Sequence, residues 1–543
     1  MGIEPADAAP SRGSFSPLRG PVFAVLWAAT VVGNIGSFMR DVASAWMVTE
    51  LSASPAAVAL IQTAATLPIF LLAIPAGVLS DILDRRRFLI GIQLLLAGVG
   101  LTMMVLAQAH TLTVESLIVL TFVGGVGAAL MGPTWQSIVP ELVPRADLRN
   151  AVALNSLGIN VSRAVGPALG GLLLVGFGAA PVYGAGVLSC LFVLAALLWW
   201  KRQPTDDALK EHFLGAFRAG LRYTRSSPDL HVVLLRAAVF FAFASAVWAL
   251  LPLVARAEPG ATAGFYGLLL GAVGAGAIGG AVWLPALRRR LDADGLMLAA
   301  SLLAATLMAA LALAPPRWLA LPLMLLLGLG WIVALTTLNG AAQAVLPNWV
   351  RGRGLAVYLT VFNGAMAGGS LAWGLVAQQL GVPAALLLSA TGLTLAALAS
   401  RRVRLPRGDA ELAPSNHWPE PLTSAPMAHD RGPVLVLIEY RIRRADRPAF
   451  EALLARLSQQ RRRDGAYAWG LTEDARDSER LAEWFLLESW GEHLRQHQRV
   501  SQADAALQAE AQLLHIGPGV PTVNHFLALA TDGAGPTERP TAE

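Results

Sequence analysis

The sequence contains little charge and almost no cysteine. Asp, Glu, Lys and Arg make up 14% of its 543 residues, whereas about 25% is usual in soluble proteins. The single cysteine, Cys190, lies in an apolar run, which excludes a disulfide framework and a cysteine zinc site. Neither lysine follows a glycine, so the Gly-Lys phosphate-binding loop of an ATP-driven pump is absent. With 55% hydrophobic residues, most of the chain is predicted to lie in lipid.

Long apolar runs fill the chain between Pro21 and Ser400. A membrane-spanning helix needs about 20 mainly apolar residues. The first run is too long for a signal peptide and lacks a cleavage pattern, so it is predicted to remain as the first span. Twelve spans are predicted, at about 22–48, 55–79, 87–108, 114–138, 151–175, 182–200, 231–255, 262–287, 295–314, 317–340, 354–378 and 382–400.

The basic residues between these spans predict the orientation. Alternate connections and the two ends of the membrane part carry 22 Lys and Arg residues, including Arg85–Arg87 and Arg288–Arg290, whereas the other connections carry two, Arg256 and Arg317. Basic loops stay on the cytoplasmic side of a membrane. We therefore expect a multi-pass protein of the cytoplasmic (inner) membrane with both termini in the cytoplasm, and no nucleic-acid partner despite the net charge of +5.

The spans divide into two six-helix bundles, 21–200 and 231–400, which follow a cytoplasmic tail, 1–20. The connection at 201–230 places Leu209, Phe213, Phe217 and Leu221 at intervals of four, which predicts an amphipathic helix on the membrane surface; a solvated linker helix is the alternative. Gln136–Val143 after span four resembles Gln343–Val350 after span ten. A recurring connection of this kind indicates two parallel repeats, with chance similarity of apolar stretches as the alternative.

The turn between spans two and three carries a candidate gating motif. It contains Gly77, Asp81, Asp84 and three arginines, Arg85, Arg86 and Arg87. A glycine permits close helix packing, an acid accepts hydrogen bonds from an opposing helix end, and the arginines form charge pairs that hold the inner side closed in one state. A plain basic loop is the alternative, but it does not explain Asp81.

These residues resemble a signature of the major facilitator superfamily. Together with Pro133-Thr-Trp135, Pro140-Glu-Leu-Val-Pro144 and Arg163–Gly171, they resemble its branch of enterobactin-exporter-like proteins and transmembrane secretion effectors. Gly166, Pro167, Gly170 and Gly171 match part of the superfamily's antiporter motif. Thr121 stands near the place of an arginine that is common in proton-coupled antiporters, and Ile82 replaces a basic residue of the turn. The resemblance implies alternating access driven by protons.

Ionisable residues inside spans are costly and are therefore functional candidates. Asn34 and Arg163 are predicted near the bilayer midplane, and Arg40 and Asp41 nearer the outer side. We expect Asp41 to take up and release protons, and Arg163 to hold substrate or to pair with Asp41. The alternatives are an interfacial salt bridge for Arg40 and Asp41 and a structural role for Arg163. Cavity candidates, with helix packing as their alternative, are Trp135, Phe243, Trp248, Trp331 and Asn339.

The chain after Ser400 changes character. A Pro- and Ser-rich linker at 401–432 precedes a pattern of strand 434–442, helix 446–463, strands 467–472 and 481–490, helix 491–514 and strand 522–530. This β-α-β-β-α-β order predicts an α+β ferredoxin-like soluble domain at 433–530, before a disordered tail at 531–543. It resembles the dimeric α/β-barrel domains of the antibiotic-biosynthesis monooxygenase group, which implies homodimerisation.

The histidines of this domain show metal-pair spacing. His493 and His497 lie four residues apart, but with no third ligand in view a solvated helix face is the favoured interpretation and no metal or cofactor is expected. His515 and His525 are interpreted as surface or strand residues.

The sequence thus predicts an all-α transporter of small amphiphilic molecules, siderophore-like or drug-like, rather than an enzyme. The alternative is a membrane-anchored enzyme or regulator whose activity lies in the C-terminal domain.

Overall fold

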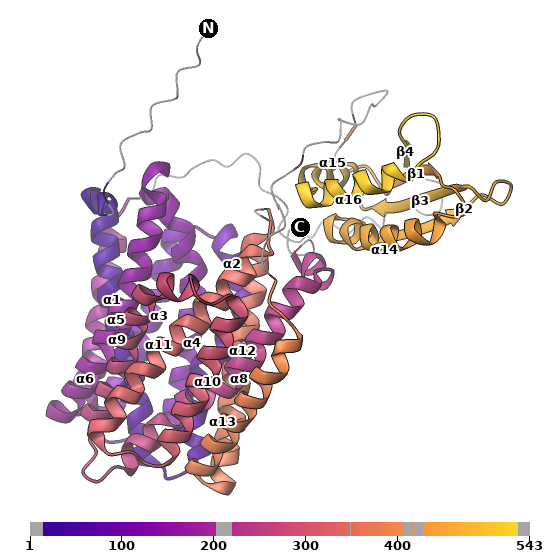
Figure 1. Cartoon of the computed structure of the whole chain (residues 1–543). Coiled ribbons are helices and arrows are strands. Elements are labelled where there is room, and N and C mark those ends of the chain that lie inside the picture. Colours follow the sequence, from indigo (N-terminus) through magenta and orange to yellow (C-terminus); the bar gives the residue numbers. More distant parts are fainter. Residues whose placement is uncertain are drawn as a thin grey trace. The chain divides into compact units, whose positions relative to one another are not determined.

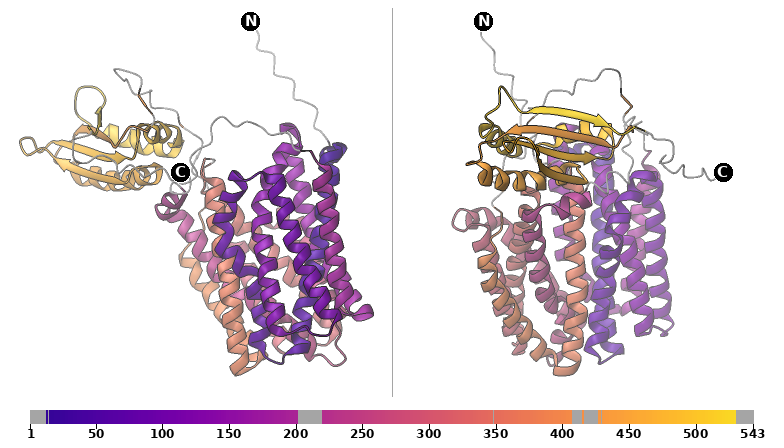
Figure 2. Two further views of the ribbon diagram at one scale, coloured as in Figure 1. Left: turned by 180° about the vertical axis from the view of Figure 1, so that it is seen from behind. Right: turned by 90° about the vertical axis from the view of Figure 1, so that its right-hand side faces the viewer.

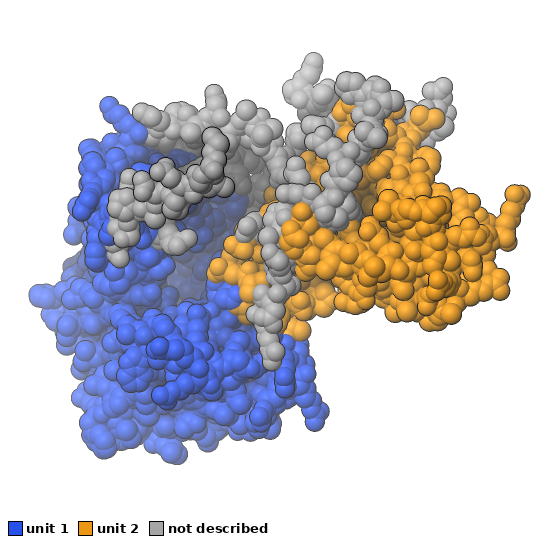
Figure 3. All heavy atoms as spheres, turned by 45° about the horizontal axis from the view of Figure 1, so that its top comes forward, with its two compact units in different colours: residues 1–208, 234–340, 356–405 blue, residues 209–233, 341–355, 406–543 orange. Residues whose placement is uncertain are grey.

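The computed structural model describes residues 13, 15–201, 220–347, 349–406, 415, 427–428 and 430–529. The chain forms two compact units (Figure 3). Unit 1 comprises residues 1–208, 234–340 and 356–405, and unit 2 comprises residues 209–233, 341–355 and 406–543. The expected amphipathic helix of the central connection lies mostly outside the described residues, as do the C-terminal tail and most of the linker.

The prediction of twelve spans is confirmed, since the described part of the chain contains twelve helices that are long and apolar enough to cross a membrane. They run side by side as a bundle (Figures 1 and 2). The helices are α1 (Pro21–Leu51), α2 (Pro55–Ile82), α3 (Arg85–Gln108), α4 (Val114–Leu142), α5 (Leu148–Phe177), α6 (Ala179–Trp199), α8 (Pro228–Ala257), α9 (Ala263–Arg288), α10 (Ala293–Ala312), α11 (Arg317–Ala344), α12 (Arg351–Leu380) and α13 (Val382–Ala399).

Local sequence signals explain where several of these helices begin. Pro21 and Pro55 occupy the first positions of α1 and α2, where the missing N–H costs nothing. Side chains of Asp84, Thr113 and Asp292 accept hydrogen bonds from the first turns of α3, α4 and α10, which satisfies backbone donors that the helix cannot pair itself.

Contacts within the first half show which turns share one end of the bundle. Ser16, in the 3-10 helix η1 (Ser16–Arg19), donates from Oγ to Asp147 Oδ1 in the α4–α5 turn at 2.7 Å. Arg86, in the α2–α3 turn, contacts the last carbonyls of α6. Arg85 at this turn also pairs with Glu141 at the end of α4. Helix η1, both turns and the end of α6 therefore lie together, and we call this the arginine-bearing end of unit 1. The end that contains Ser54 is called the opposite end.

The second half is organised in the same way. Arg236 near the start of α8 donates to Asp294 at the start of α10 and to the carbonyl of Ser400 after α13. Helices that are separated along the chain thus meet at matching ends, as expected of spans that alternate in direction. This arrangement is the basis for comparing the two halves.

The C-terminal part contains a four-stranded antiparallel sheet. Its strands are β1 (Val434–Arg441), β2 (Ala468–Glu473), β3 (Arg480–Leu487) and β4 (Thr522–Leu527), in the order β2-β3-β1-β4. Helices α14 (Arg447–Asp464), α15 (Trp490–Arg499) and α16 (Gln502–Leu513) lie between them in sequence. The predicted element order is confirmed, whereas the relation to dimeric α/β-barrel monooxygenase domains stays a prediction.

The core of this domain lies between the sheet and its helices. Alternate residues of β1, from Val434 to Tyr440, are buried with Phe485 of β3 and with Phe450, Leu454 and Leu457 of α14. Register places Val436 opposite both Phe485 and His525, so His525 shares the core face of the sheet.

One predicted element of the domain is wrong in its length. The expected helix 491–514 is two helices, because Ser501 begins α16 with a reciprocal capping box to Asp504. A capping box of this kind satisfies backbone donors at a helix start and favours a new helix.

Candidate functional site

The two halves of unit 1 meet at the opposite end of the bundle. Ser54 Oγ of α2 donates to Gln378 Oε1 of α12 at 2.8 Å, and Thr63 Oγ1 donates to the carbonyl oxygen of Ala367 at 3.2 Å. Sequence reasoning missed these contacts, because polar residues near span ends carry no mark of their partners.

A second seam joins the halves along α5 and α9. A Cβ atom added to Gly171 would lie 2.6 Å from the carbonyl oxygen of Ala263 and 3.0 Å from Gly267 Cα. One added to Gly267 would lie 2.5 Å from the carbonyl oxygen of Pro167. The two backbones are therefore in direct contact, as small residues allow between membrane helices.

The antiporter-like segment also packs tightly on α1. A Cβ atom on Gly166 would lie 2.6 Å from Phe38 Cβ, and one on Gly170 would lie 2.8 Å from Met39 Cα. The glycines of this segment thus hold α5 close to both α1 and α9. An added side chain at these glycines would therefore push α5 away from its neighbours.

The arginines of the α2–α3 turn bind neighbours within their own half. Arg85 Nη1 donates to Glu141 Oε1 of α4 at 2.5 Å and to the carbonyl oxygen of Ser137 at 3.2 Å. Glu141 was not predicted as a partner, although it lies in the Pro140-Glu-Leu-Val segment. The ion pair ties the start of α3 to the end of α4.

The other residues of the predicted gating motif contact different neighbours. Arg86 donates from Nε and Nη2 to the carbonyl oxygens of Leu197 and Leu198, each at 2.8 Å; the last carbonyls of a helix lack partners and carry partial negative charge. Asp84 Oδ1 accepts from the backbone N–H of Arg87 at 2.8 Å, and Arg87 is exposed. Gly77 and Asp81 lie in the last turns of α2, and the side chain of Asp81 is outside the described part.

Arg40 and Asp41 form an ion pair in α1. Arg40 Nη2 lies 3.0 Å from Asp41 Oδ1, with the arginine side chain 13% exposed and the aspartate side chain 48% exposed. The guanidinium lies beside Gly124 of α4, where an added Cβ would be 3.4 Å from Nη1. Further along α1, the Trp46 ring stacks on Tyr266 of α9, with ring centroids 6.1 Å apart. Helix α1 therefore contacts the second half of the bundle just beyond this ion pair.

Arg163 and Asn34 are half-buried in α5 and α1. Within the part of the chain that the structure describes, neither side chain has a hydrogen-bond or ion-pair partner, and Arg163 does not pair with Asp41. A guanidinium inside a span is costly unless it is paired or solvated.

Aromatic side chains gather in the second half. The Trp331 ring of α11 lies 5.0 Å from Trp248 and 5.3 Å from Phe241, both in α8, and Phe241 lies 4.4 Å from Phe362 of α12. Edge-to-face contacts of this kind stabilise aromatic clusters beyond their burial. Two of the predicted cavity residues, Trp248 and Trp331, thus belong to one cluster.

The remaining cavity candidates have other surroundings. Phe243 packs on Trp373, with ring centroids 5.8 Å apart. Trp135 is half-buried against two apolar clusters, one formed by α1, α3, α4 and α6 and the other by α1, α4 and α5, as the packing alternative describes. Asn339 lies near the end of α11 and has a partner.

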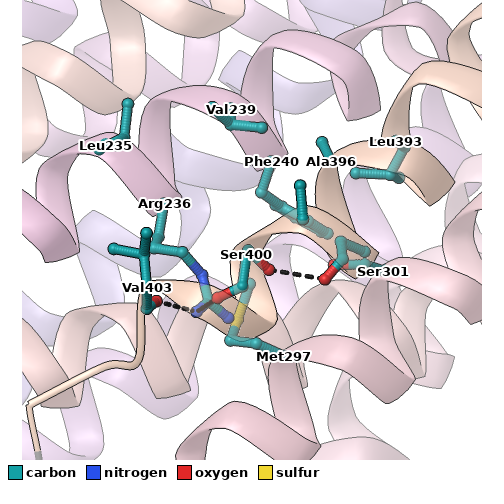
Figure 4. Close-up of a pocket in the computed structure, with 12 residues that line it drawn as sticks. Leu235, Arg236, Val239, Phe240, Met297, Ser301, Leu393, Ala396, Ser400 and Val403 are labelled. Carbon is teal, nitrogen blue, oxygen red and sulfur yellow. Dashed lines mark hydrogen bonds between the residues drawn. The ribbon is translucent and has the colours of Figure 1, made fainter.

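A cavity of about 280 Å³ lies at the arginine-bearing end of the second half, between α8, α10 and α13 (Figure 4). Beside it, Arg236 Nη1 donates to Asp294 Oδ1 and to the carbonyl oxygen of Val403, each at 2.8 Å. The rest of the lining is mainly apolar and includes Leu235, Phe240 and Leu393. None of the predicted site residues lines this cavity, so it is separate from the candidate transport site.

Comparison with known proteins identifies the family to which the chain belongs. The family model described as transmembrane secretion effector matches residues 12–533. The chain belongs to the transmembrane secretion effector family. The match extends beyond the twelve spans and through the C-terminal sheet.

Relatives of this transmembrane secretion effector include exporters. The multidrug efflux pump Tap of Mycolicibacterium fortuitum is 27% identical over 402 residues, which cover 72% of this chain and 96% of that protein. The enterobactin exporter EntS of Salmonella typhimurium is 27% identical over 322 residues, or 59% of this chain and 76% of that protein. Macrolide efflux protein A of Streptococcus pyogenes is 25% identical over 237 residues, or 43% of this chain and 58% of that protein.

Solved structures share the fold. A bacterial homologue of the human lysosomal transporter Spinster, in an inward-facing and unoccupied conformation, has a TM-score of 0.57 at 16% identity and covers 71% of this chain and 98% of its own. The nucleoside transporter NupG has a TM-score of 0.60 at 12% identity, with 70% and 99% covered. The predicted major facilitator fold is confirmed.

Unit 2 of the secretion effector contains a salt-bridge cluster around α15. Glu492 Oε1 accepts from Arg499 at 2.6 Å and from Arg222 at 2.8 Å, and the Arg499 guanidinium lies 4.4 Å from the Trp349 ring centroid. Burial alone would raise the pKa of Glu492, but the arginines around it outweigh burial and hold that pKa below its ordinary value. Arg222 precedes α8 and Trp349 precedes α12, so α15 contacts the chain next to two spans.

A second buried network lies in the core of the C-terminal domain. Glu483, fully buried on β3, accepts from Arg461 Nε and from Trp469 Nε1, each at 3.0 Å. Tyr440 Oη lies 3.3 Å from Glu483 Oε2, and burial raises the pKa of Tyr440 well above its ordinary value. The carboxylate is satisfied by three side chains, which favours a structural role.

The histidines of α15 do not form a solvated face. His493 is 1% exposed, so that interpretation is wrong for this residue. The inner side of α15 packs on the sheet, and β4 brings His525 to it. The ring centroid of His493 lies 4.6 Å from those of His497 and His525. His525, which was interpreted as a surface or strand residue, does lie on β4, but its approach to α15 was not expected because only the strand register brings it there. His515 accepts from the Arg441 backbone N–H at 2.8 Å, at the far end of β1.

Proposed function

We propose that this transmembrane secretion effector is a proton-driven exporter of small amphiphilic molecules that works by alternating access. The observation that carries the proposal is the pair of charges in α1. An ion pair between Arg40 and a half-exposed Asp41 lies in a span, where ionisable residues are expensive and serve transport. Tap and EntS, which are named as exporters, support the direction of transport.

The arginine-bearing end is proposed to face the cytoplasm, together with both termini. The distribution of basic residues supports this orientation. The halves are joined at the opposite end by Ser54–Gln378 and by the α5–α9 seam, and these contacts support a conformation in which the outer side is closed. An exporter in this conformation receives its substrate from the cytoplasm or the inner leaflet.

Asp41 is proposed to carry the coupled proton. In its charged form it attracts Arg40, and protonation removes that attraction and frees the guanidinium beside Gly124. Because Trp46 on the same helix stacks on Tyr266 of the second half, a movement of α1 that follows protonation would change the contact between the halves as well as the local pair. Proton binding and the closing of the outer side are thereby linked.

Arg163 and the aromatic cluster are proposed to select the substrate. An unpaired guanidinium attracts an anionic or strongly polar group, and the cluster around Trp331 offers apolar contact to the rest of an amphiphile. Asn34 lies on the neighbouring α1 and supplies an amide. Siderophore-like and drug-like compounds both fit this description.

The test replaces Asp41 with Asn in chain reconstituted into lipid vesicles. Gradient-driven transport is expected to be lost, whereas substrate exchange without a gradient is retained, because exchange needs no net proton transfer. Glu115→Gln, which changes an exposed acid in the first turn of α4, is the matched control. Undiminished pH-driven transport in Asp41→Asn would show that Asp41 does not carry the coupled proton.

The C-terminal domain is proposed to regulate and dimerise the transporter. Its contacts to Arg222 and Trp349 next to two spans support regulation. The sheet face away from its helices carries Leu435, Trp484 and the half-exposed Phe526, which supports pairing with a second copy. Chain truncated after Ser400 is expected to transport substrate but to lose crosslinked dimers. A truncated chain without any transport would favour the anchored-enzyme alternative.

A further inference from the structure

Three histidine side chains converge in the C-terminal domain. His493 and His497 lie one turn apart on α15, and His525 projects from β4 on the core face of the sheet. One nitrogen from each ring can be chosen so that the three atoms lie within 4.8 Å of one another. Two of the ligands are thus fixed by helical spacing and the third by strand register.

The buried member of this cluster lacks partners. Neither ring nitrogen of His493 has a hydrogen-bond partner in the described structure, although its side chain is 1% exposed. The neighbouring amide of Gln496 interacts with the imidazole without reaching hydrogen-bond geometry. Buried polar groups are almost always satisfied, so an unpartnered imidazole that faces two others indicates a missing ligand.

The cluster also has the chemistry that a metal ion requires. All three side chains are imidazoles, the commonest metal ligands in proteins, and they come together in one cluster. Neutral imidazole is the form that coordinates metals. Trp490 packs against His493 and His525, with centroids 5.2 Å and 6.1 Å away, and shields one side of the cluster from water.

We propose that His493, His497 and His525 form a binding site for a divalent transition-metal ion. Three imidazoles suit Zn²⁺ and its neighbours rather than Mg²⁺ or Ca²⁺, which prefer oxygen ligands. Tetrahedral Zn²⁺ with bonds of about 2.0–2.1 Å places its ligand nitrogens about 3.3 Å apart. The half-buried rings of His497 and His525 must therefore draw in slightly, and a fourth position stays open to water or an anion.

The position of the site gives it a structural consequence. A metal ion would join α15 to β4, which otherwise pack together through the rings of Trp490, His493 and His525. The same helix carries Glu492 and Arg499, whose partners Arg222 and Trp349 lie next to spans α8 and α12. Metal binding would therefore fix the helix through which the domain contacts those segments. This inference does not depend on the direction or the driving force of transport.

The experiment measures Zn²⁺ binding by the full-length chain in detergent, purified with a histidine-free tag and stripped of metal. The wild-type chain is expected to bind one Zn²⁺ per chain with a Kd of about 1 µM or tighter. His493→Ala and His525→Ala are each expected to weaken binding at least about 100-fold. His515→Ala, in the same domain but outside the cluster, is the matched control and should bind as the wild type does.

Two further readouts separate loss of the site from loss of the fold. Co²⁺ in the wild-type chain should give the visible absorption of a tetrahedral centre, and this band should be absent in His525→Ala. Zn²⁺ should raise the Tm of the wild-type domain but not that of His525→Ala, while the two metal-free chains show the same circular dichroism. Equal Zn²⁺ affinity in the wild type and both cluster variants would overturn the proposal. So would a wild-type chain that binds no Zn²⁺ at a free Zn²⁺ concentration of about 10 µM, ten times the expected Kd.

Discussion

The seam between α5 and α9 predicts that one added methyl group shifts the conformational equilibrium of the transporter. In the described conformation, a Cβ atom on residue 171 would lie 2.6 Å from the carbonyl oxygen of Ala263. Carbon–oxygen contacts are usually no shorter than about 3.3 Å. In Gly171→Ala, the two helices must therefore separate by about 0.7 Å at this point, and the strain is present only while the outer side is closed.

The size of the effect follows from packing energies. Forcing an extra methyl group into a tight contact costs about 1–3 kcal/mol. Because the open state does not carry this cost, the ratio of closed to open molecules should fall about 5–150-fold. A change of this size is measurable even when the closed state starts as the major form.

The assay uses a disulfide between the halves as a reporter of closure. Cys190 is the single cysteine, so Cys190→Ser gives a chain without thiols, and Ser54→Cys with Gln378→Cys introduces a pair where the native side chains are 2.8 Å apart. Gly171→Ala should slow crosslinking of this pair. Gly98→Ala, at a glycine with open space around it, should leave it unchanged. Equal crosslinking rates in all three chains would refute the assignment of a closed outer side.

Three further outcomes follow from the charge clusters. Glu492→Gln leaves Arg499 and Arg222 without their shared carboxylate. Denaturant titration should show that the free energy of unfolding of the C-terminal domain falls by about 3 kcal/mol. Arg495→Ala, which removes an exposed partner of Glu492, is the control and should lower it by under about 1 kcal/mol. The pKa of Glu492 is lower in the folded domain than in the unfolded chain. The charged carboxylate therefore stabilises the folded domain fully at pH values above the ordinary Glu pKa of about 4.3, and this stabilisation is lost as the pH falls through the pKa of the folded domain. When stability is measured from pH 6 downward, it should fall less steeply in Glu492→Gln than in the wild type. Arg86→Ala removes two hydrogen bonds to the end of α6, and thermal unfolding should show that the protein loses about 2 kcal/mol of stability. Arg87→Ala, which changes an exposed side chain, is the control and should leave the stability unchanged.

The spans could be predicted because each is a local property of about 20 residues. Their bounds shifted by only a few residues, since flanking arginines and prolines mark the ends. The break between α15 and α16 was missed, although Ser501 and Asp504 have capping-box spacing; the apolar pattern continued through it and outweighed the cap. Local sequence therefore predicts helices better than it predicts where one helix gives way to the next.

The partners of the candidate residues could not be predicted in the same way. Glu141 pairs with Arg85 across 56 positions, and His525 lies 28 positions after His497. Such pairs depend on which helices pack together and on strand register, neither of which a single sequence encodes locally. The neighbouring Arg40 and Asp41 were recognisable because the two charges are adjacent in the chain.

The most direct test of the account is transport in inverted membrane vesicles, in which the cytoplasmic face is outermost. A panel of siderophore-like and drug-like amphiphiles is offered with and without an imposed proton gradient, acidic inside. The account predicts that vesicles containing the transporter accumulate at least one compound, and that a protonophore abolishes the accumulation. Accumulation that is equal with and without the gradient would contradict proton-driven export.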